Sequence, residues 1–238
     1  MKKVVEIRNL TKDFGELRAV NNLSFSINEG ELFGLLGPNG SGKTTTVKLL
    51  TGQLKPTKGS AKVLGLNVLN DPIKIREIVG IIPEQETPPS FLTAEEYLYF
   101  VAKIRKLENI KELCDWWFDF LDFNDQKHAL CKDLSRGTRQ KLMFAQAFLH
   151  EPKLAFIDEP LINLDPIIQR KVKDYLQEYV KEGNTIFFST HVLEIAEEIC
   201  TRIGILDQGK LIYEGSMKDT KRKKRHLEDF FIKLVKEA

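Results

Sequence analysis

Residues 37–45 combine glycines, a lysine and two threonines in a spacing that can hold a phosphate chain. They read Gly-Pro-Asn-Gly-Ser-Gly-Lys-Thr-Thr and match the phosphate-loop pattern G-x-x-x-x-G-K-[ST]. Glycines let successive backbone N–H groups turn toward phosphate oxygens, and the helix that follows adds the positive end of its dipole. Lys43 is expected to reach the β- and γ-phosphates of a nucleotide, and the Thr44 hydroxyl is expected to bind Mg²⁺. The predicted contacts are Gly37, Pro38, Asn39, Gly40, Ser41, Gly42, Lys43, Thr44 and Thr45.

Carboxylate and imidazole side chains follow two later apolar runs, where they could act on a bound triphosphate. The run 154–157 leads into Asp158 and Glu159. Asp158 is expected to hold Mg²⁺, and Glu159 is expected to accept a proton from the attacking water. His191 lies beyond the run 185–188, at the edge of a predicted parallel sheet where ligands bind in open α/β folds. The alternatives are an exposed acidic pair and a structural histidine.

A second phosphate-recognising element is predicted where a helix begins after residue 134. Ser135 is a good N-cap for a helical run that includes residues 142–149. Gly137 leaves its backbone N–H open to an anion. In isolation this would be an ordinary helix start, so the prediction depends on its order relative to the other motifs.

Strand-like and helical patterns divide the chain into three parts. The first third carries short apolar runs separated by turn residues, at 4–7, 23–27, 32–36, 61–64 and 79–82. From Thr93 to about His150 the pattern is helical and opens with a capping box that ends at Glu96. The last third returns to strands at 154–157 and 185–188, a helix at 167–181 and a hairpin at 202–206 and 210–213.

The composition fits a chain with a sizeable core and little bulk charge. Of the 238 residues 42% are hydrophobic and the net charge is +2, which excludes a strongly basic nucleic-acid binder. Cys114, Cys131 and Cys200 match no metal spacing, and their use fits a reducing cytosol. No apolar run approaches the roughly 18–20 residues that cross a bilayer. The first residues lack the apolar core of a signal peptide.

These motifs, in this order, resemble the ATP-binding cassette (ABC) family over essentially the whole chain, and specifically a transporter nucleotide-binding subunit. Residues 37–45 look like the Walker A motif, and 154–159 look like Walker B with its catalytic glutamate. Residues 134–138 look like the signature usually written LSGGQ, and His191 looks like the switch histidine. The D-loop corresponds to Asn163, Leu164 and Asp165.

Two departures from the family pattern resemble the branch that exports drugs, peptides, antibiotics or lipids, or extrudes sodium. The signature carries Arg136 and Thr138 where glycine and glutamine are common. The glutamine of the family's Q-loop normally follows a proline directly, whereas Pro83 is followed here by Glu84 and then Gln85. Either Glu84 or Gln85 could supply the oxygen ligand for Mg²⁺, and both alternatives stay open.

The resemblance implies an α/β fold: a P-loop NTPase core with a mainly parallel central sheet, an N-terminal antiparallel β subdomain and an inserted α-helical subdomain. It implies one ABC ATPase domain over residues 1–238. Residues 1–83 and 151–217 would form the β and core parts. Residues 84–150 would form the helical subdomain with the Q-loop and signature, and 218–238 would form a C-terminal helix that includes the basic run 218–225.

For the site, the resemblance implies ATP and Mg²⁺ as cofactors and ATP hydrolysis as the reaction. The implied catalytic residues are Glu159, His191 and Lys43. Phe14 would stack on adenine, with a core phenylalanine as its alternative, and Val20 would also contact ATP. A second subunit would supply its signature in trans to close the site. The implied trans contacts are Ser135, Gly137 and Thr138.

For the assembly, the resemblance implies a homodimer, or a heterodimer with another ABC ATPase, bound to an integral membrane permease. The subunit would lie at the cytoplasmic face of the membrane and power transport, with no nucleic acid as partner. One alternative is a soluble ABC-type ATPase that remodels a ribosome or DNA, and another is a module that holds ATP without hydrolysing it. The sequence does not define the transported molecule.

Overall fold

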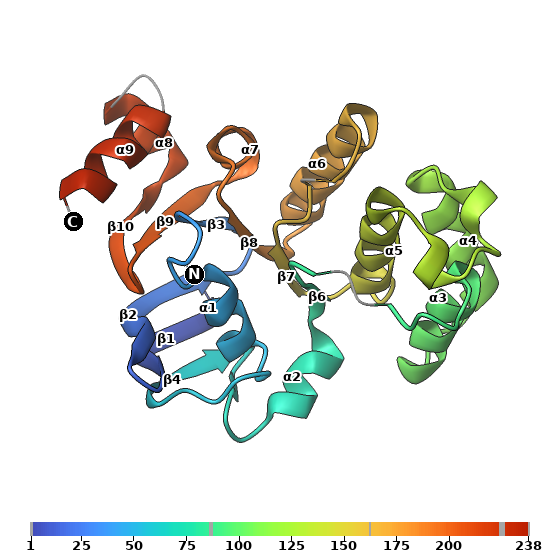
Figure 1. Ribbon diagram of the computed structural model, residues 1–238, viewed down its shortest axis with the longest axis horizontal. Helices are drawn as coiled ribbons and strands as arrows, with labels where there is room; N and C mark the ends of the chain where they lie inside the picture. Colours follow the sequence, from blue (N-terminus) through green and yellow to red (C-terminus); the bar gives the residue numbers. More distant parts are fainter. Residues whose placement is uncertain (1, 86–87, 162, 224–226, 238) are drawn as a thin grey trace.

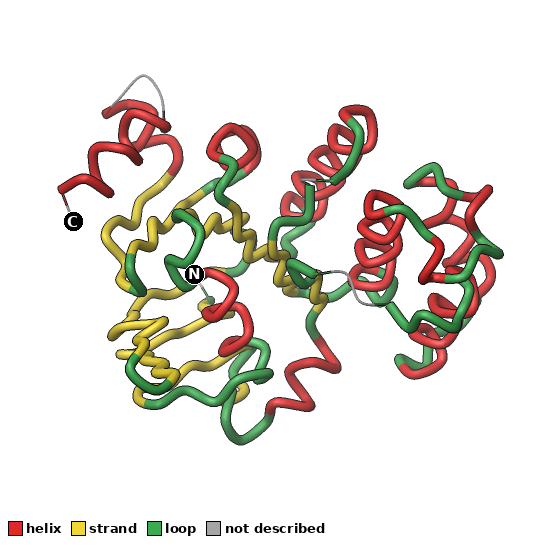
Figure 2. The backbone as a smooth tube through the Cα atoms, viewed as in Figure 1, coloured by secondary structure: helices red, strands yellow, loops and turns green. Residues whose placement is uncertain are grey.

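The structure is a computed structural model that describes residues 2–85, 88–161, 163–223 and 227–237. Its described strands form two sheets, and a group of helices lies to one side of them (Figures 1 and 2). The strands are β1 (Lys3–Phe14), β2 (Leu17–Asn28), β3 (Leu32–Leu36), β4 (Lys58–Val63), β5 (Leu66–Asn67), β6 (Gly80–Ile82), β7 (Leu154–Asp158), β8 (Thr185–Thr190), β9 (Arg202–Asp207) and β10 (Lys210–Ser216).

The smaller sheet is antiparallel and has the strand order β2-β1-β4-β5. The predicted runs 4–7 and 23–27 lie inside the longer strands β1 and β2, which pair with each other over most of their length. Val5, Ile7 and Leu10 of β1 are buried in the apolar core beneath this sheet. The expected N-terminal antiparallel sheet is therefore present.

The larger sheet has the order β10-β9-β3-β8-β7-β6, and β10 alone among its described strands runs antiparallel to its neighbour. Strands β3, β7 and β8 are buried at every residue, as expected for central strands covered on both faces. Because these strands are parallel, their carboxyl ends meet at one edge. That edge carries the loop after Leu36, the Asp158 carboxylate and the Thr190 hydroxyl.

Helices flank the larger sheet and also form a separate helical part. The flanking helices are α1 (Lys43–Leu50), α2 (Pro72–Ile78), α6 (Pro166–Lys181) and α7 (Leu193–Ile199). The helical part contains α3 (Ala94–Ile104), α4 (Ile110–Phe120) and α5 (Arg136–Phe148), with short 3-10 turns at Asn124–Gln126 and Cys131–Asp133. The predicted capping box at the start of α3 is confirmed, because Thr93 and Glu96 bond each other's backbone N–H.

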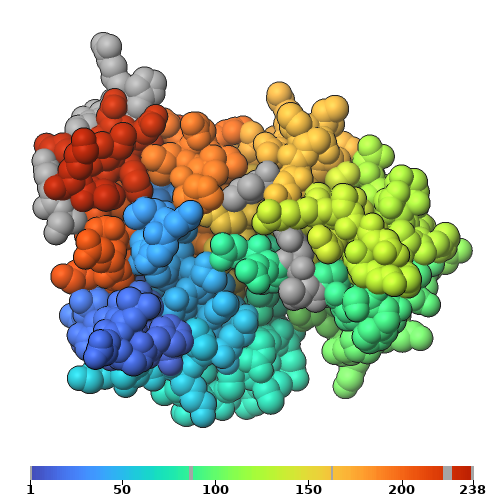
Figure 3. All heavy atoms as spheres, viewed as in Figure 1, coloured from blue at the N-terminus to red at the C-terminus, as the bar shows by residue number. Residues whose placement is uncertain are grey.

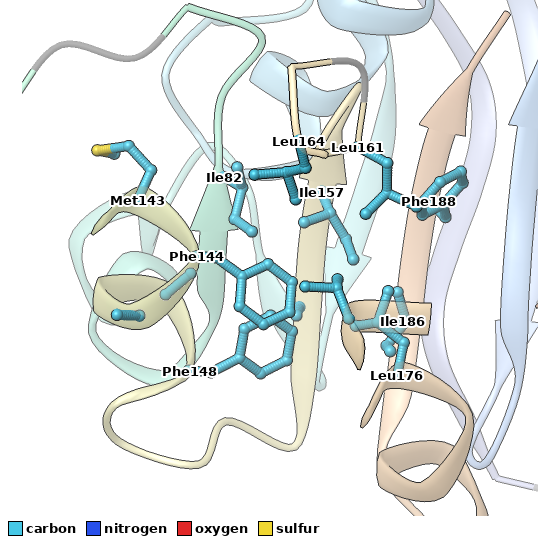
Figure 4. Close-up of a cluster of buried hydrophobic side chains, with 14 of the residues drawn as sticks. Ile82, Met143, Phe144, Phe148, Ile157, Leu161, Leu164, Leu176, Ile186 and Phe188 are labelled. Carbon is cyan, nitrogen blue, oxygen red and sulfur yellow. The ribbon is translucent and has the colours of Figure 1, made fainter. Parts of the chain in front are cut away.

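The helical part is joined to the larger sheet by a shared apolar core. Figure 4 shows the rings of Phe144 and Phe148, from α5, pointing toward Ile157 of β7. Leu176 of α6 and Ile186 of β8 lie in the same cluster, and all five side chains are fully buried. This packing joins the C-terminal half of α5 to the strand that carries Asp158.

The chain ends in two helices, α8 (Met217–Lys223) and α9 (Leu227–Glu237), where one terminal helix was predicted. Figure 3 shows them, in red, at the end of the molecule opposite the helical part in green. The basic run 218–225 lies partly outside the described residues. Among the residues that the structure describes, no helix has the length and apolar character to span a membrane.

Candidate functional site

The loop between β3 and α1 forms a tight cradle that only glycine permits at two positions. Gly42 precedes α1 with a φ of 104°, and a Cβ atom there would lie 2.3 Å from the Ala19 carbonyl oxygen. A Cβ atom on Gly37 would lie 2.3 Å from the Leu206 carbonyl oxygen. Contacts this short are sterically forbidden. The loop therefore has the close backbone path that the phosphate-loop pattern predicts.

Lys43 is folded back against this loop. Its Nζ atom donates to the carbonyl oxygens of Gly37, at 2.8 Å, and Pro38, at 3.2 Å, and the residue is only 6% exposed. Burial lowers the pKa of the Lys43 ammonium, whereas the nearby carboxylates of Glu159 and Asp158 oppose that shift. The ammonium is thus held beside two anions, where phosphate oxygens could replace its carbonyl partners.

A cavity of about 360 Å³ extends from the phosphate loop to the junction of β1 and β2. Phe14 lies at the end of β1 and is 45% exposed. An exposed aromatic ring beside a phosphate loop is suited to stack on a nucleotide base. Val20 does not line this cavity, because its side chain is fully buried in the core, and Leu17 and Ala19 form the wall instead. The cavity also contacts Asn39, Gly40, Gly42, Lys43, Thr44, Thr45, Glu84 and Glu159.

Three oxygen-bearing side chains meet on the other side of the loop. The Thr44 hydroxyl donates to Glu84 Oε2 at 3.2 Å. Asp158 is 1% exposed and accepts a hydrogen bond from the Ser189 hydroxyl. Burial raises the pKa of the Asp158 carboxyl, the Ser189 and Thr44 hydroxyls oppose that rise, and Glu84 adds to it.

This set of oxygen donors fits Mg²⁺, which prefers one or two carboxylates completed by water and phosphate oxygens. Glu84 reaches the cradle directly and lines three cavities around it, whereas Gln85 lines one beside Thr44 and Asp158. Of the two Q-loop candidates, Glu84 is therefore the residue in contact with a phosphate-loop side chain.

The Glu159 carboxylate is held by the end of β8. Thr190 Oγ1 donates to Glu159 Oε2 at 2.8 Å, and the His191 backbone N–H donates to Oε1 at 2.8 Å. His191 Nδ1 lies 2.6 Å from the same Oε1 atom. The backbone of Glu159 has a φ of 52°, which is uncommon for a residue other than glycine and turns its side chain toward β8. The structure thus brings the predicted base and the predicted switch histidine into direct contact.

The signature residues lie at the start of α5, close to the D-loop of the same chain. Ser135 is the N-cap, and its Oγ atom accepts the Thr138 N–H at 3.1 Å and shares a hydrogen bond with the Thr138 hydroxyl at 2.8 Å. A Cβ atom on Gly137 would lie 2.8 Å from the Asn163 carbonyl oxygen. The signature helix and the D-loop are therefore in van der Waals contact through a glycine.

The D-loop residues have three separate environments. Asn163 faces a small cavity of about 100 Å³ together with Arg136, Glu84, Glu159 and His191. The next residue, at 164, is a leucine buried in the core. The one after it, an aspartate at 165, is the N-cap of α6 and accepts the N–H groups of residues 167 and 168. This cavity is lined together by residues of the predicted signature and Q-loop and by the predicted base Glu159, all from one chain.

Sequence reasoning did not assign Ser189 and Thr190, the two hydroxyl residues that hold Asp158 and Glu159. Their signal was present, because polar residues directly after an apolar strand run point to the functional edge of a parallel sheet. Another feature that it missed is a groove of about 920 Å³ away from the phosphate loop. Helices α2 and α3 and the segment after α5 form this groove, and Arg105 and His150 line it.

Comparison with known proteins identifies the family. The family model described as ABC transporter matches residues 20–162, more than half of the chain. The uncharacterized ABC transporter ATP-binding protein MJ1023 of Methanocaldococcus jannaschii is 35% identical over 230 residues, which cover 96% of this chain and 83% of that protein. The bacitracin transport ATP-binding protein BcrA of Bacillus licheniformis is 33% identical over 231 residues, which cover 97% of this chain and 75% of that protein.

A solved structure has the same fold. It is the dimeric, post-hydrolysis state of the ATP-binding cassette MJ0796 bound to ADP and Pi, with a TM-score of 0.83 and 25% identity over 90% of this chain and 98% of that chain. The resemblance inferred from the motifs, and the fold class that it implied, are both confirmed. The chain therefore belongs to the ABC transporter family and has the ATPase fold of the family's ATP-binding subunits.

Proposed function

We propose that this subunit hydrolyses ATP to power transport through a separate membrane subunit, and that the direction is export. The observation that carries the proposal is the Glu159 carboxylate, which faces both the nucleotide cavity and the small cavity beside His191. A carboxylate at that place can accept the proton of the water that attacks the γ-phosphate. The similarity to a bacitracin transport protein supports export.

In this mechanism each side chain has a separate task. Lys43 binds the β- and γ-phosphates, and Thr44, Asp158 and Glu84 hold Mg²⁺. The metal, when bound, neutralises charge on the phosphate oxygens. Glu159 takes the proton from water. His191 leaves Glu159 to contact the γ-phosphate, which its half-exposed ring permits.

ATP-driven dimerisation would complete the site. Ser135 lies on the exposed start of α5, so its hydroxyl is accessible to a second subunit. Together with Gly137 and Thr138 it would contact the γ-phosphate in trans, because a helix N-terminus favours anions. ATP bound between two subunits would stabilise the closed dimer, since only that state makes both sets of contacts. The dimeric form of the MJ0796 cassette supports this arrangement.

The helical part and the groove of about 920 Å³ offer a surface for the membrane subunit. We place the helical subdomain at residues 84–150, between core parts at 1–83 and 151–217, with residues 218–238 as the C-terminal element. Apolar residues of α2 and α3, including Ile73, Ile78 and Ile104, are exposed at this groove. Docking there would keep the subunit at the cytoplasmic face of the membrane.

The test is the substitution Glu159→Gln, which keeps the shape of the side chain and removes its basicity. We expect ATP binding to persist and the rate of hydrolysis to fall at least about 100-fold, the usual contribution of a general base. The ATP-bound dimer should therefore accumulate in solution, and light scattering measures it as a doubled molecular mass. The matched control is Glu112→Gln, on an exposed position of α4, which should hydrolyse ATP as the wild type does. A Glu159→Gln variant with the wild-type rate would refute the assignment of the base.

A second measurement tests the transport partner. The subunit is tagged, expressed in its own host and purified from detergent-solubilised membranes. Co-purification of a multi-span membrane protein in stoichiometric amount would support the transport assignment. Recovery of the subunit only from the soluble fraction, bound to ribosomes or DNA, would contradict it.

A further inference from the structure

We infer that Thr190 is a positioning residue that anchors one carboxylate oxygen of Glu159, so that the other oxygen is the atom that meets the attacking water. The inference rests on the proposed role of Glu159 as the base. It adds an assignment for each of the two oxygens and a residue that fixes their orientation.

Glu159 Oε2 is bound by a rigid and enclosed donor. Thr190 Oγ1 donates to it at 2.8 Å, and Thr190 is only 1% exposed. Thr190 is the last residue of β8 and pairs with Leu36 of β3, directly before the phosphate loop. Its Oγ1 atom accepts the Val192 N–H at 3.0 Å. Since a hydroxyl has one proton and that proton is directed to Glu159, the two contacts fix the orientation of the Thr190 hydroxyl.

Glu159 Oε1 is bound by a donor that can leave. The His191 ring lies 2.6 Å from it and its side chain is 44% exposed, whereas the Glu159 side chain is 8% exposed. If the His191 ring turned toward a γ-phosphate, Oε1 would lose its contact with the ring and would keep the hydrogen bond from the His191 backbone N–H at 2.8 Å. A carboxylate oxygen has two acceptor sites, so Oε1 could then accept a hydrogen bond from water.

The difference between the two donors assigns the oxygens. Oε2 stays on the strand end throughout the cycle, and Oε1 changes from the imidazole to water. Without the Thr190 hydroxyl, the carboxylate could rotate about its terminal torsion, which is broad and roughly two-fold. A base that is misplaced loses rate even when the nucleotide is bound normally.

The experiment measures the steady-state kinetics of two variants of Thr190. Thr190→Val keeps the shape of the side chain and removes the hydroxyl, and Thr190→Ser keeps the hydroxyl. A hydrogen bond to a charged group corresponds to a factor of about 10 to 100. We therefore expect the kcat of Thr190→Val to fall by that factor with KM within about twofold, and Thr190→Ser to restore most of it.

The matched control is Thr185→Val, which makes the same change at the other end of β8. Thr185 is fully buried, and its hydroxyl accepts the Gly30 N–H at 3.1 Å, far along the strand from Glu159. It should keep the wild-type kcat within twofold. Thermal unfolding checks that each variant is folded, and Thr190→Ala is the second hydroxyl-free variant if Thr190→Val fails to fold.

A double-mutant cycle separates positioning from a structural effect. If Thr190 acts through Glu159, then Thr190→Val should lower the residual hydrolysis of Glu159→Gln by less than about twofold, measured with radiolabelled ATP in a single turnover. If Thr190→Val lowered the hydrolysis rate of Glu159→Gln by the same factor as it lowers that of the wild type, the inference would be overturned. So would a wild-type kcat for folded Thr190→Val, or a change confined to KM. If Glu159→Gln itself hydrolyses at the wild-type rate, the assigned base is wrong and the anchor is refuted with it.

Discussion

Protonation of His150 should weaken the fold in mildly acidic solution, and replacing His150 should remove that sensitivity. His150 follows α5 and lines the groove between the helical part and α2. Both of its ring nitrogens are buried. Burial, and to a smaller extent the Arg105 guanidinium, lower the pKa of His150 to about 4, and an interaction with the Val79 backbone only partly offsets these effects. The folded state therefore holds the imidazole neutral.

The size of the effect follows from proton linkage. The unfolded chain binds a proton at His150 with a pKa of about 6.5, so between about pH 6.5 and 4 it binds more protons than the folded chain. The contribution of neutral His150 to the unfolding free energy is thus fully present above pH 7 and is lost as the pH falls. With a folded pKa of about 4, the loss is about 2 kcal/mol at pH 5 and approaches about 3 kcal/mol below pH 4.

The assay is urea unfolding at pH 7.5, 6.5, 5.5 and 5.0 for the wild type and His150→Gln. The difference in unfolding free energy between the two proteins should change by about 2 kcal/mol from pH 7.5 to pH 5.0, in favour of the variant at low pH. The control is His128→Gln, whose side chain is 83% exposed and which should follow the wild-type curve. Parallel pH profiles for the wild type and His150→Gln would refute the reasoning.

Three further substitutions test the nucleotide site and the signature helix. Glu84→Ala should weaken the Mg²⁺-dependent part of nucleotide affinity about tenfold, whereas Gln85→Ala should change it less than twofold, because Glu84 is the one of these two neighbours that accepts a hydrogen bond from the Thr44 hydroxyl in the described part of the chain. Titration of a fluorescent nucleotide with and without Mg²⁺ decides between them. Gly137→Ala places a Cβ atom 2.8 Å from the Asn163 carbonyl oxygen, so the unfolding free energy should fall by about 1–2 kcal/mol and ATP hydrolysis should fall more than tenfold. Wild-type hydrolysis by Gly137→Ala would show that the signature and D-loop do not need this contact.

The sequence was sufficient for features that depend on local pattern. The phosphate loop needs glycine at fixed positions. The apolar run before the loop and the helical pattern after it lie within about 20 residues of sequence, so the whole motif can be recognised locally. The Thr93 capping box and the Ser135 cap are equally local, and both are present. Asp158 follows from the end of an apolar run, because a buried parallel strand places its last side chains at the edge that binds ligands.

Features that depend on which residue faces which side were harder to predict. Successive side chains of a strand point to opposite faces, so a displacement of one residue exchanges core and site. Val20 shows this, since it lies in the core while the adjacent Ala19 lines the cavity beside the phosphate loop. The choice between Glu84 and Gln85 has the same origin, because these neighbours occupy a loop whose path no periodicity defines.

Motif reasoning can mark the functional edge of a parallel sheet, but it cannot say which residues of strands distant in sequence contact each other there. Thr190 and Glu159 are brought together by the parallel pairing of β7 and β8, in which Asp158 lies opposite Ser189. The same register brings Ser189 to Asp158 and Thr190 to Glu159. Two adjacent hydroxyls therefore bind two adjacent carboxylates, the proposed metal ligand Asp158 and the proposed base Glu159.

This pairing bears on why a single subunit should hydrolyse ATP slowly. Among the described residues, Oε2 of Glu159 accepts a hydrogen bond from Thr190, and Oε1 has both of its acceptor sites taken by the backbone and the ring of His191, so water can reach Oε1 after the ring leaves. The ring that must leave belongs to His191, and its proposed new partner is the γ-phosphate. A γ-phosphate held only by Lys43 and the phosphate loop stays open to solvent, which weakens its attraction for the ring. Closure by a second subunit, with its Ser135 over the phosphate, would exclude that solvent and favour the transfer of His191. In the proposed mechanism, dimerisation would thus activate hydrolysis by releasing Oε1 of Glu159.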